Sequence, residues 1–277
     1  MKIAVTGASG MLGSIICRKS KDEIYGTYNN GIVKNVVPIK MDVTSKEEVK
    51  KTFEKIKPDW VIHCAGIVSN ELCNANPKLA WSVNVNGTKN ISEACIKHGT
   101  SMLYVSTGNV FDGLKGFYKE DDKTNPIAVY GKTKLEGEIF TQNVDKHIIV
   151  RMSLLYGAGG RFFDNLIGNL KLGKRTEVVE GNYLSPTFNE DAANAILNLI
   201  KKSAFGVCHV AADRMSRIEF SKKVANFCGF DNSLIVPVKS MFGGSIRRSD
   251  HSLNPSKSVK LGIKYTPMNL ALKSIRI

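Results

Sequence analysis

The sequence predicts an α/β fold with a doubly wound parallel sheet and a smaller C-terminal lobe. Short apolar segments alternate with helical patterns from the first residue to about residue 150. These segments are apolar throughout, as strands are when helices cover both faces of a parallel sheet. With 277 residues, of which 43% are hydrophobic, the chain is long enough to bury such a core.

Six strands are predicted in the first part of the chain, at residues 3–5, 23–28, 36–39, 60–63, 102–105 and 148–150. Helices are predicted at residues 12–19, 46–56, 77–97 and 130–140. Ser45 and Glu48 have the spacing of a capping box before the second helix, and Pro77 suits the first turn of the third.

The pattern changes after the glycine-rich segment 156–160. Glycine and proline then interrupt the chain irregularly, and only residues 206–210 still predict a buried strand. We therefore expect residues 1–157 to form the sheet domain, with a later return strand near 206–210. Residues 158–277 are expected to form mainly the smaller lobe.

The composition excludes several classes of protein. No apolar run approaches the about 20 residues of a membrane span, and the first residues carry no secretion signal. The six cysteines are scattered without a C-x-x-C pair, which favours reduced thiols and a cytoplasmic protein. The net charge of +14 comes from dispersed lysines rather than from a basic run interleaved with aromatics, so nucleic acid is not expected as a partner.

A glycine-rich turn joins the first predicted strand to the first helix. Its glycines are spaced three residues apart. In such a turn the first glycine permits the tight bend, the second lets backbone N–H groups approach a diphosphate, and the third lets helix and strand pack closely. The helix N-terminus would hold the diphosphate. The turn predicts a Rossmann-type dinucleotide-binding domain, with contacts from Gly7, Ser9, Gly10, Met11, Leu12 and Gly13.

The end of the second predicted strand bears on which dinucleotide binds. Residues 27–30 read Thr-Tyr-Asn-Asn and supply no carboxylate for the ribose 2′-hydroxyl of NAD. NADP(H) is therefore favoured and NAD(H) stays open, with Lys34 the nearest cation. Asp42, followed by Val43, would either accept a hydrogen bond from the adenine amino group or cap the next helix.

Tyr130 and Lys134 stand four residues apart in a predicted helix, so their side chains share one face. The fifth strand delivers the hydroxyl of Thr107 to the carboxyl edge of the sheet. An ammonium about 4 Å from a phenol supplies about 4 kcal/mol at an effective dielectric of about 20, enough to lower a pKa by about 3 units. We therefore expect Lys134 to lower the pKa of Tyr130 and to make it a proton donor and acceptor near pH 7.

Together these motifs resemble the extended short-chain dehydrogenase/reductase superfamily, and finer details resemble the dTDP-4-dehydrorhamnose reductase family. The similarity covers essentially the whole chain. Its motifs are the blocks 106–113 and 130–138, Arg151 followed by Tyr156-Gly157, the triplet 185–187 and the segment 216–220. The block 130–138 is the most specific of them.

The resemblance implies NADPH-dependent reduction of a 4-keto-6-deoxy nucleotide sugar, as in dTDP-L-rhamnose biosynthesis. Thr107 would bind the ketone oxygen, Tyr130 would protonate the alkoxide, and Lys134 would hold the nicotinamide ribose. Further implied cofactor contacts are Cys64, Ala65, Gly66 and Asn84, and the implied substrate contacts are Thr107, Asn109, Arg151 and Arg248.

Three departures from the family pattern lie on the substrate side, at 108–109, 181–182 and 248–249. They leave the identity of the nucleotide sugar open. The acidic residues of a metal site described for some members have no match, so no metal is predicted. Two alternatives remain: a non-catalytic regulatory subunit like that of methionine adenosyltransferase, and a nucleotide-sugar epimerase or dehydratase. A homodimer would use the helices near 77–97 and 130–142.

Overall fold

The computed structural model describes residues 1–277 except 32, 35, 240–248 and 276–277. The chain forms two compact units. Unit 1 comprises residues 1–111, 123–151 and 193–208, and unit 2 comprises residues 112–122, 152–192 and 209–277. Of the helices described, none has both the length and the apolar character that a membrane crossing requires.

Unit 1 is built around a seven-stranded sheet with the order β11-β6-β5-β4-β1-β2-β3. The pairings β1–β2, β2–β3, β1–β4 and β4–β5 are parallel. The strands are β1 (Lys2–Thr6), β2 (Glu23–Tyr28), β3 (Val37–Lys40), β4 (Trp60–His63), β5 (Ser101–Thr107), β6 (His147–Met152) and β11 (Gly206–His209). The predicted parallel sheet is confirmed, and β11 lies next to β6 in it.

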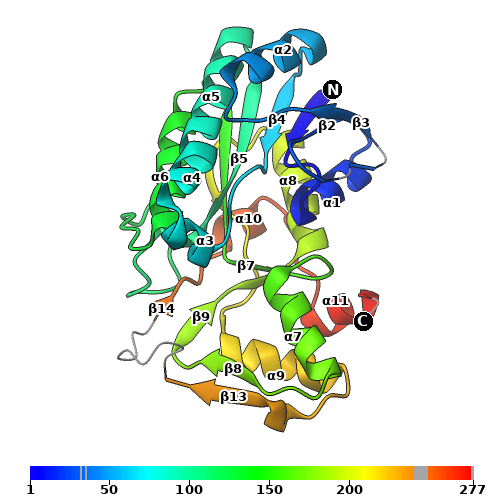
Figure 1. The fold of residues 1–277 in the computed structure, drawn as a ribbon, viewed down its shortest axis with the longest axis vertical. Helices are drawn as coiled ribbons and strands as arrows, with labels where there is room; N and C mark the ends of the chain where they lie inside the picture. Colours follow the sequence, from blue (N-terminus) through cyan, green and yellow to red (C-terminus); the bar gives the residue numbers. More distant parts are fainter. Residues whose placement is uncertain (32, 35, 240–248, 276–277) are drawn as a thin grey trace. The chain divides into compact units, whose positions relative to one another are not determined.

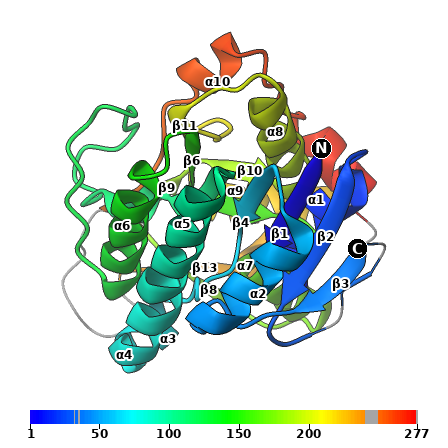
Figure 2. The same cartoon turned by 90° about the horizontal axis from the view of Figure 1, so that it is seen from above.

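Helices cover both faces of this sheet (Figure 2). On one face lie α2 (Lys46–Ile56), α5 (Gly87–His98) and α6 (Val129–Gln142), and on the other α1 (Met11–Lys19) and α8 (Asn189–Lys201). Val49 and Phe53 of α2 and Ile91 of α5 are almost completely buried in a cluster with strand residues. Both faces are covered, which explains why the strand sequences show no alternation between apolar and polar residues.

The predicted long helix at 77–97 is divided in the structure. Asn70–Ala75 forms a short helix α3 that the sequence analysis did not predict, and α4 (Pro77–Trp81) follows it. A π-helical turn, Ser82–Asn86, then leads into α5, with Gly87 N–H donating to the carbonyl of Ser82. Such turns insert an extra residue into a helix and are frequent at functional sites.

Among the residues described, unit 2 contains three small sheets, four complete α-helices and a short 3-10 helix, Asn232–Leu234 (Figure 1). β7 (Leu154–Tyr156) pairs with β10 (Pro186–Phe188), and β8 (Thr176–Val179) with β13 (Ile235–Val238). β9 (Asn182–Leu184) lies between β12 (Met215–Ser216) and β14 (Ser249–Asp250). The helices are α7 (Arg161–Lys171), α9 (Arg217–Phe227), α10 (Ser256–Lys260) and α11 (Met268–Ser274).

Candidate active site

The three glycines of the loop between β1 and α1 serve different purposes. Gly7 has a φ of +65°, and a Cβ there would lie 2.8 Å from the backbone nitrogen of Ala65. A Cβ on Gly13 would lie 2.3 Å from the carbonyl oxygen of Gly7. A Cβ on Gly10 would meet only that oxygen, at 3.2 Å. The fold therefore demands Gly7 and Gly13, whereas a Cβ on Gly10 would make a single tight contact with a backbone oxygen.

The first turn of α1 is suited to an anion. Gly10 is its N-cap residue and offers no side chain to the first N–H groups of the helix. Ser9 Oγ is turned away and donates to the carbonyl oxygen of Asn30 at 2.8 Å. Because the N–H groups at a helix start carry partial positive charge, this end of α1 is where a diphosphate would bind.

Asp42 orders the turn before α2. Its Oδ1 accepts hydrogen bonds from the backbone N–H and the hydroxyl of Thr44, both at 2.8 Å, and its Oδ2 accepts one from Asn29 at 3.2 Å. Only half of the expected capping box is present. Ser45 accepts from the N–H of Glu48 at 3.3 Å, but the Glu48 carboxylate accepts from the N–H of Asp42 at 2.8 Å. These contacts match the helix-start role of Asp42, and an adenine contact stays a prediction.

Thr107, Tyr130 and Lys134 come together in unit 1. All three are buried; Thr107 ends β5, and the other two lie on α6. The hydroxyl of Thr107 accepts from the backbone N–H and the side-chain amide of Asn109, each at 3.2 Å, and hydrogen-bonds the phenol of Tyr130. Since its lone pairs serve Asn109, the single proton of Thr107 is directed at Tyr130.

Lys134 lies beside the chain that follows β4. Its Nζ is 4.0 Å from the centroid of the Tyr104 ring, and a Cβ on Gly66 would also be 4.0 Å from that nitrogen. The chain after β4 therefore passes close to the ammonium. The predicted cofactor segment at residues 64–66 and the predicted catalytic lysine thus share one location.

Burial governs the pKa values of the reactive pair. It raises the pKa of Tyr130 to about 12, and the hydrogen bond from Thr107 acts in the opposite direction. Burial also lowers the pKa of Lys134 to about 7, against the attraction of Glu138. The expected lowering of the Tyr130 pKa by Lys134 is not found: the pKa is raised instead, with loss of hydration as the largest cause. Tyr130 therefore stays protonated near pH 7, the form in which it can donate a proton.

Asn84 lies in the π-helical turn and holds two other segments. Its Oδ1 accepts from the N–H of Ile67 at 2.7 Å, and its Nδ2 donates to the carbonyl of Ile67 and to Thr133 Oγ1, both at 3.0 Å. The hydroxyl of Thr133 in turn donates to the carbonyl of Tyr130 at 2.8 Å. Asn84 thereby fixes the chain after β4 against the start of α6.

The resemblance implied that Arg151 contacts the substrate, and in the structure its side chain pairs with another residue of unit 1. Its guanidinium is buried and pairs with Glu138, with 2.7 Å between Nη2 and Oε2. The hydroxyl of Ser106 donates to the same carboxylate. Arg151 therefore joins β6 to α6 inside unit 1, because an unpaired buried carboxylate would be costly. The other arginine proposed for substrate, Arg248, lies outside the described residues.

Three polar residues of this region were missed by the sequence analysis. They are His63 at the end of β4, Thr88 in α5 and Thr133 in α6, and all three are fully buried. A signal existed for two of them. His63 is the polar residue that closes an otherwise apolar strand, and Thr133 lies three residues after Tyr130, on the same helix face.

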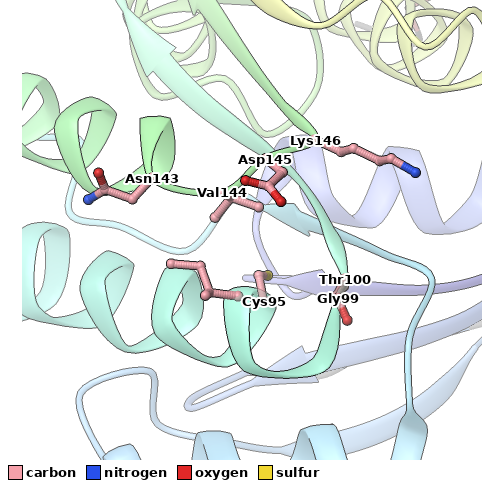
Figure 3. A pocket seen from close by; sticks show the side chains of 8 residues that line it. Cys95, Gly99, Thr100, Asn143, Val144, Asp145 and Lys146 are labelled. Carbon is pink, nitrogen blue, oxygen red and sulfur yellow. The ribbon is translucent and has the colours of Figure 1, made fainter.

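A cavity of about 260 Å³ lies elsewhere in unit 1 (Figure 3). It is lined by Cys95, Ile96, Gly99 and Thr100 at the end of α5 and by residues 143–146 after α6. These segments lead into the amino ends of β5 and β6, whereas Thr107 marks the carboxyl end of β5. The cavity is therefore separate from the candidate active site.

Comparisons with known proteins point to one family. The family model described as RmlD substrate binding domain matches residues 1–275. A dTDP-4-dehydrorhamnose reductase from Aggregatibacter actinomycetemcomitans is 34% identical over 210 residues, 74% of this chain and 69% of that protein. The crystal structure of a hypothetical dTDP-4-dehydrorhamnose reductase from Sulfolobus tokodaii is 30% identical, with a TM-score of 0.90 over 98% of this chain and 99% of that one.

Two further relatives carry different names, one that of a reductase and the other that of an enzyme subunit. A dTDP-4-dehydrorhamnose reductase from Bacillus anthracis, crystallised in complex with NADP, is 28% identical, with a TM-score of 0.86 over 98% of this chain and 97% of that one. The methionine adenosyltransferase 2 subunit beta of Xenopus tropicalis is 26% identical over 284 residues, 97% of this chain and 85% of that protein. Since the family model spans nearly the whole sequence, the chain belongs to the RmlD substrate-binding family, within the extended short-chain dehydrogenase/reductase superfamily that its motifs resemble.

Proposed function

We propose that this NAD(P)-dependent oxidoreductase uses NADPH to reduce a 4-keto-6-deoxy nucleotide sugar, with dTDP-4-dehydrorhamnose as the substrate. The observation that carries the proposal is the buried group of Thr107, Tyr130 and Lys134 in the same unit as the glycine loop. The dTDP-4-dehydrorhamnose reductases among the relatives support the choice of substrate.

The residues of unit 1 fit a dinucleotide. Backbone N–H groups at the start of α1 are free of a side-chain cap, and Gly10 leaves room for a diphosphate against them. Residues 27–30 carry no acid that would repel a 2′-phosphate, which favours NADPH. The contacts we propose for the cofactor are Gly7, Ser9, Gly10, Met11, Leu12, Gly13, Asp42, Val43, Cys64, Ala65, Gly66, Asn84, Tyr130 and Lys134.

The bound nicotinamide would supply a hydride to the sugar carbonyl. Tyr130 is protonated at neutral pH and donates its proton to the carbonyl oxygen as negative charge develops there. Thr107 orients the phenol through its hydroxyl and is itself held by Asn109. The ammonium of Lys134 stabilises the tyrosinate left after proton transfer. Tyr130 thus supplies the proton, Thr107 orients the phenol, and Lys134 balances the charge left on it.

A second function has one specific observation in its favour. The methionine adenosyltransferase 2 subunit beta aligns over 97% of this chain. A regulatory subunit of that kind would bind a dinucleotide and a partner enzyme without reducing a sugar. The complete set of Thr107, Tyr130 and Lys134 favours the reductase.

The test is a reduction assay with a panel of 4-keto nucleotide sugars, in which the absorbance of NADPH is followed. The wild-type protein should oxidise NADPH fastest with dTDP-4-dehydrorhamnose. Tyr130→Phe removes only the proton donor, so turnover should fall about 10²- to 10⁴-fold while NADPH affinity stays within a few-fold. Tyr25→Phe is the matched control, because its hydroxyl binds Glu23 at the surface and should not affect turnover.

Three results would contradict the proposal. If no sugar in the panel is reduced while NADPH binds and a partner enzyme co-purifies, the regulatory function is correct. If the purified protein retains tightly bound NAD and interconverts sugars without net oxidation of NADPH, it is an epimerase. Equal turnover by wild type and Tyr130→Phe would remove Tyr130 from the mechanism.

A further inference from the structure

His63 lies at the centre of a continuous buried chain of hydrogen bonds. Thr6, at the start of the glycine loop, pairs in register with His63, and its Oγ1 lies 2.6 Å from His63 Nδ1. On the other side of the ring, Nε2 lies 3.1 Å from Thr88 Oγ1. Thr88 donates to the carbonyl of Asn84 at 2.7 Å. His63 therefore bridges the loop after β1 and the π-helical turn.

The chain continues to the catalytic helix. Asn84 donates from its side chain to Thr133 Oγ1, and Thr133 donates to the backbone carbonyl of Tyr130. Thr6, His63, Asn84 and Thr133 are each at most 1% exposed. The chain is therefore shielded from bulk water, and its hydrogen bonds are electrostatically stronger than they would be in water.

The directions of these bonds fix the tautomer of His63. With the proton of the Thr88 hydroxyl on the carbonyl of Asn84, Thr88 Oγ1 accepts from the ring; the phenol of Tyr104 is a further hydrogen-bond partner of Thr88. Nε2 must therefore carry the proton, and Nδ1 must accept. Thr6 Oγ1 accepts from the N–H of Ala65 at 3.2 Å and donates its own proton to Nδ1. In this arrangement the hydroxyls of Thr6 and Thr88 and both ring nitrogens of His63 are paired.

We propose that His63 is a positioning residue that holds the cofactor loop and the helix bearing Tyr130 in register through the chain Thr6–His63–Thr88–Asn84–Thr133. The proposal rests on the proposed function for its kinetic consequences only. A side chain with one acceptor and one donor on opposite sides of a flat ring is needed here, and among the neutral side chains only histidine has that geometry. Stacking on Tyr104, with 5.6 Å between ring centroids, keeps the ring in its plane.

Thr6→Val and Thr88→Val each remove one hydroxyl with little change in shape, and each interrupts the chain at His63. Each should lower kcat and weaken NADPH binding by about 2- to 30-fold, the range typical of coupling through a packed network. Combined in one protein, the two substitutions should cost no more than the larger single effect, because either one already interrupts the chain. Effects that multiply would show two independent local contacts and overturn the proposal.

Thr141→Val is the matched control for Thr88→Val. Thr141 is also fully buried in a helix and donates to the carbonyl four residues earlier, Gly137, at 2.8 Å, but it has no link to His63. Its replacement should leave kcat and NADPH affinity unchanged. An equal loss in Thr141→Val would mean that the Thr88 effect reflects helix stability rather than the chain.

A spectroscopic measurement tests the proposal without a substrate. In ¹⁵N spectra of the whole protein, His63 should show a protonated Nε2 and an unprotonated Nδ1 that do not change from pH 5 to 8, with or without NADPH. The opposite tautomer, or titration of the ring in this range, would overturn the proposal. If the wild type reduces no sugar, the spectra and the NADPH affinities still decide the role of His63, so its failure and that of the proposed function are distinguishable.

Discussion

Arg151 on β6 and Glu138 on α6 form a bidentate ion pair in which both side chains are almost completely buried. Arg151 Nη2 lies 2.7 Å from Oε2 and Nε lies 3.0 Å from Oε1 of the carboxylate. The guanidinium also lies over the ring of Phe111, 5.1 Å from its centroid. Glu138 is one helical turn beyond Lys134, so this pair supports α6 directly behind the reactive residues.

Arg151→Met leaves the carboxylate of Glu138 buried without its partner. Loss of one member of a buried pair costs about 3–5 kcal/mol, so the free energy of unfolding should fall by about that amount in urea titrations. Replacing Glu138 by Leu in the same protein should recover much of the loss. Lys223→Met is the control, since its pair with Glu219 is exposed and should contribute less than about 1 kcal/mol. A loss of that small size in Arg151→Met would contradict the structural role.

Gly10→Val should abolish cofactor binding and leave the fold intact. A Cβ at this position meets only one backbone oxygen, so the side chain would occupy the space in front of the α1 N-terminus. The rise in Tm that saturating NADPH gives the wild type should therefore disappear, while the Tm of the free protein stays within a few degrees. Gly13→Val provides the contrast, because its Cβ would collide with the carbonyl of Gly7 and should destabilise the protein itself. An unchanged NADPH-induced shift in Gly10→Val would refute the loop assignment.

The sequence predicts the sheet and the residues Thr107, Tyr130 and Lys134 because each rests on a local signal. Strands β2 and β4 have the predicted bounds, since both are short segments rich in β-branched or aromatic residues. Two features were not predictable in this way. Asn84 in the π-helical turn hydrogen-bonds Ile67, and Arg151 pairs with Glu138 across a strand and a helix, so both features involve tertiary contacts. The local spacing of residues predicts neither feature.

The prediction that the pKa of Tyr130 is lowered was wrong for a related reason. A Coulomb term between two residues of one helix can be written from their spacing, but the loss of hydration depends on what the rest of the chain places around them. Burial is the largest cause of the raised phenol pKa, and the spacing of Tyr130 and Lys134 could not reveal it. The protonation states of the site therefore could not be predicted from the sequence, although its residues could.

His63 should make the protein sensitive to acid. Burial, with a contribution from Lys134, lowers the pKa of His63 to about 3. Between that value and about 6.5 the unfolded chain binds a proton that the folded protein does not, so the free energy of unfolding falls as the pH drops. The loss should be about 2 kcal/mol at pH 5, relative to pH 7. In His63→Gln the dependence on pH over this range should be shallower by that amount, and equal slopes would show that His63 is not the group responsible.

Lys134→Met should make the protein more stable and inactive. Burial lowers the pKa of Lys134 from 10.5 to about 7, so near neutral pH the folded state must either lose a proton or hold a buried ammonium. At about 1.4 kcal/mol per pKa unit, the lowered pKa of Lys134 reduces the free energy of unfolding by about 4 kcal/mol at pH 7. Because the unfolded chain binds the extra proton between pH 7 and 10.5, the stability of the wild type should rise over that range, and the gain from the substitution should shrink.

We expect Lys134→Met to raise the free energy of unfolding at pH 7 by about 2–4 kcal/mol and to lose reductase activity, as is typical when a strained catalytic residue is replaced. Lys132→Met, exposed on the same helix, should change stability by less than about 0.5 kcal/mol. A Lys134→Met protein that is no more stable than the wild type at pH 7 would show that the ammonium is not buried at a cost.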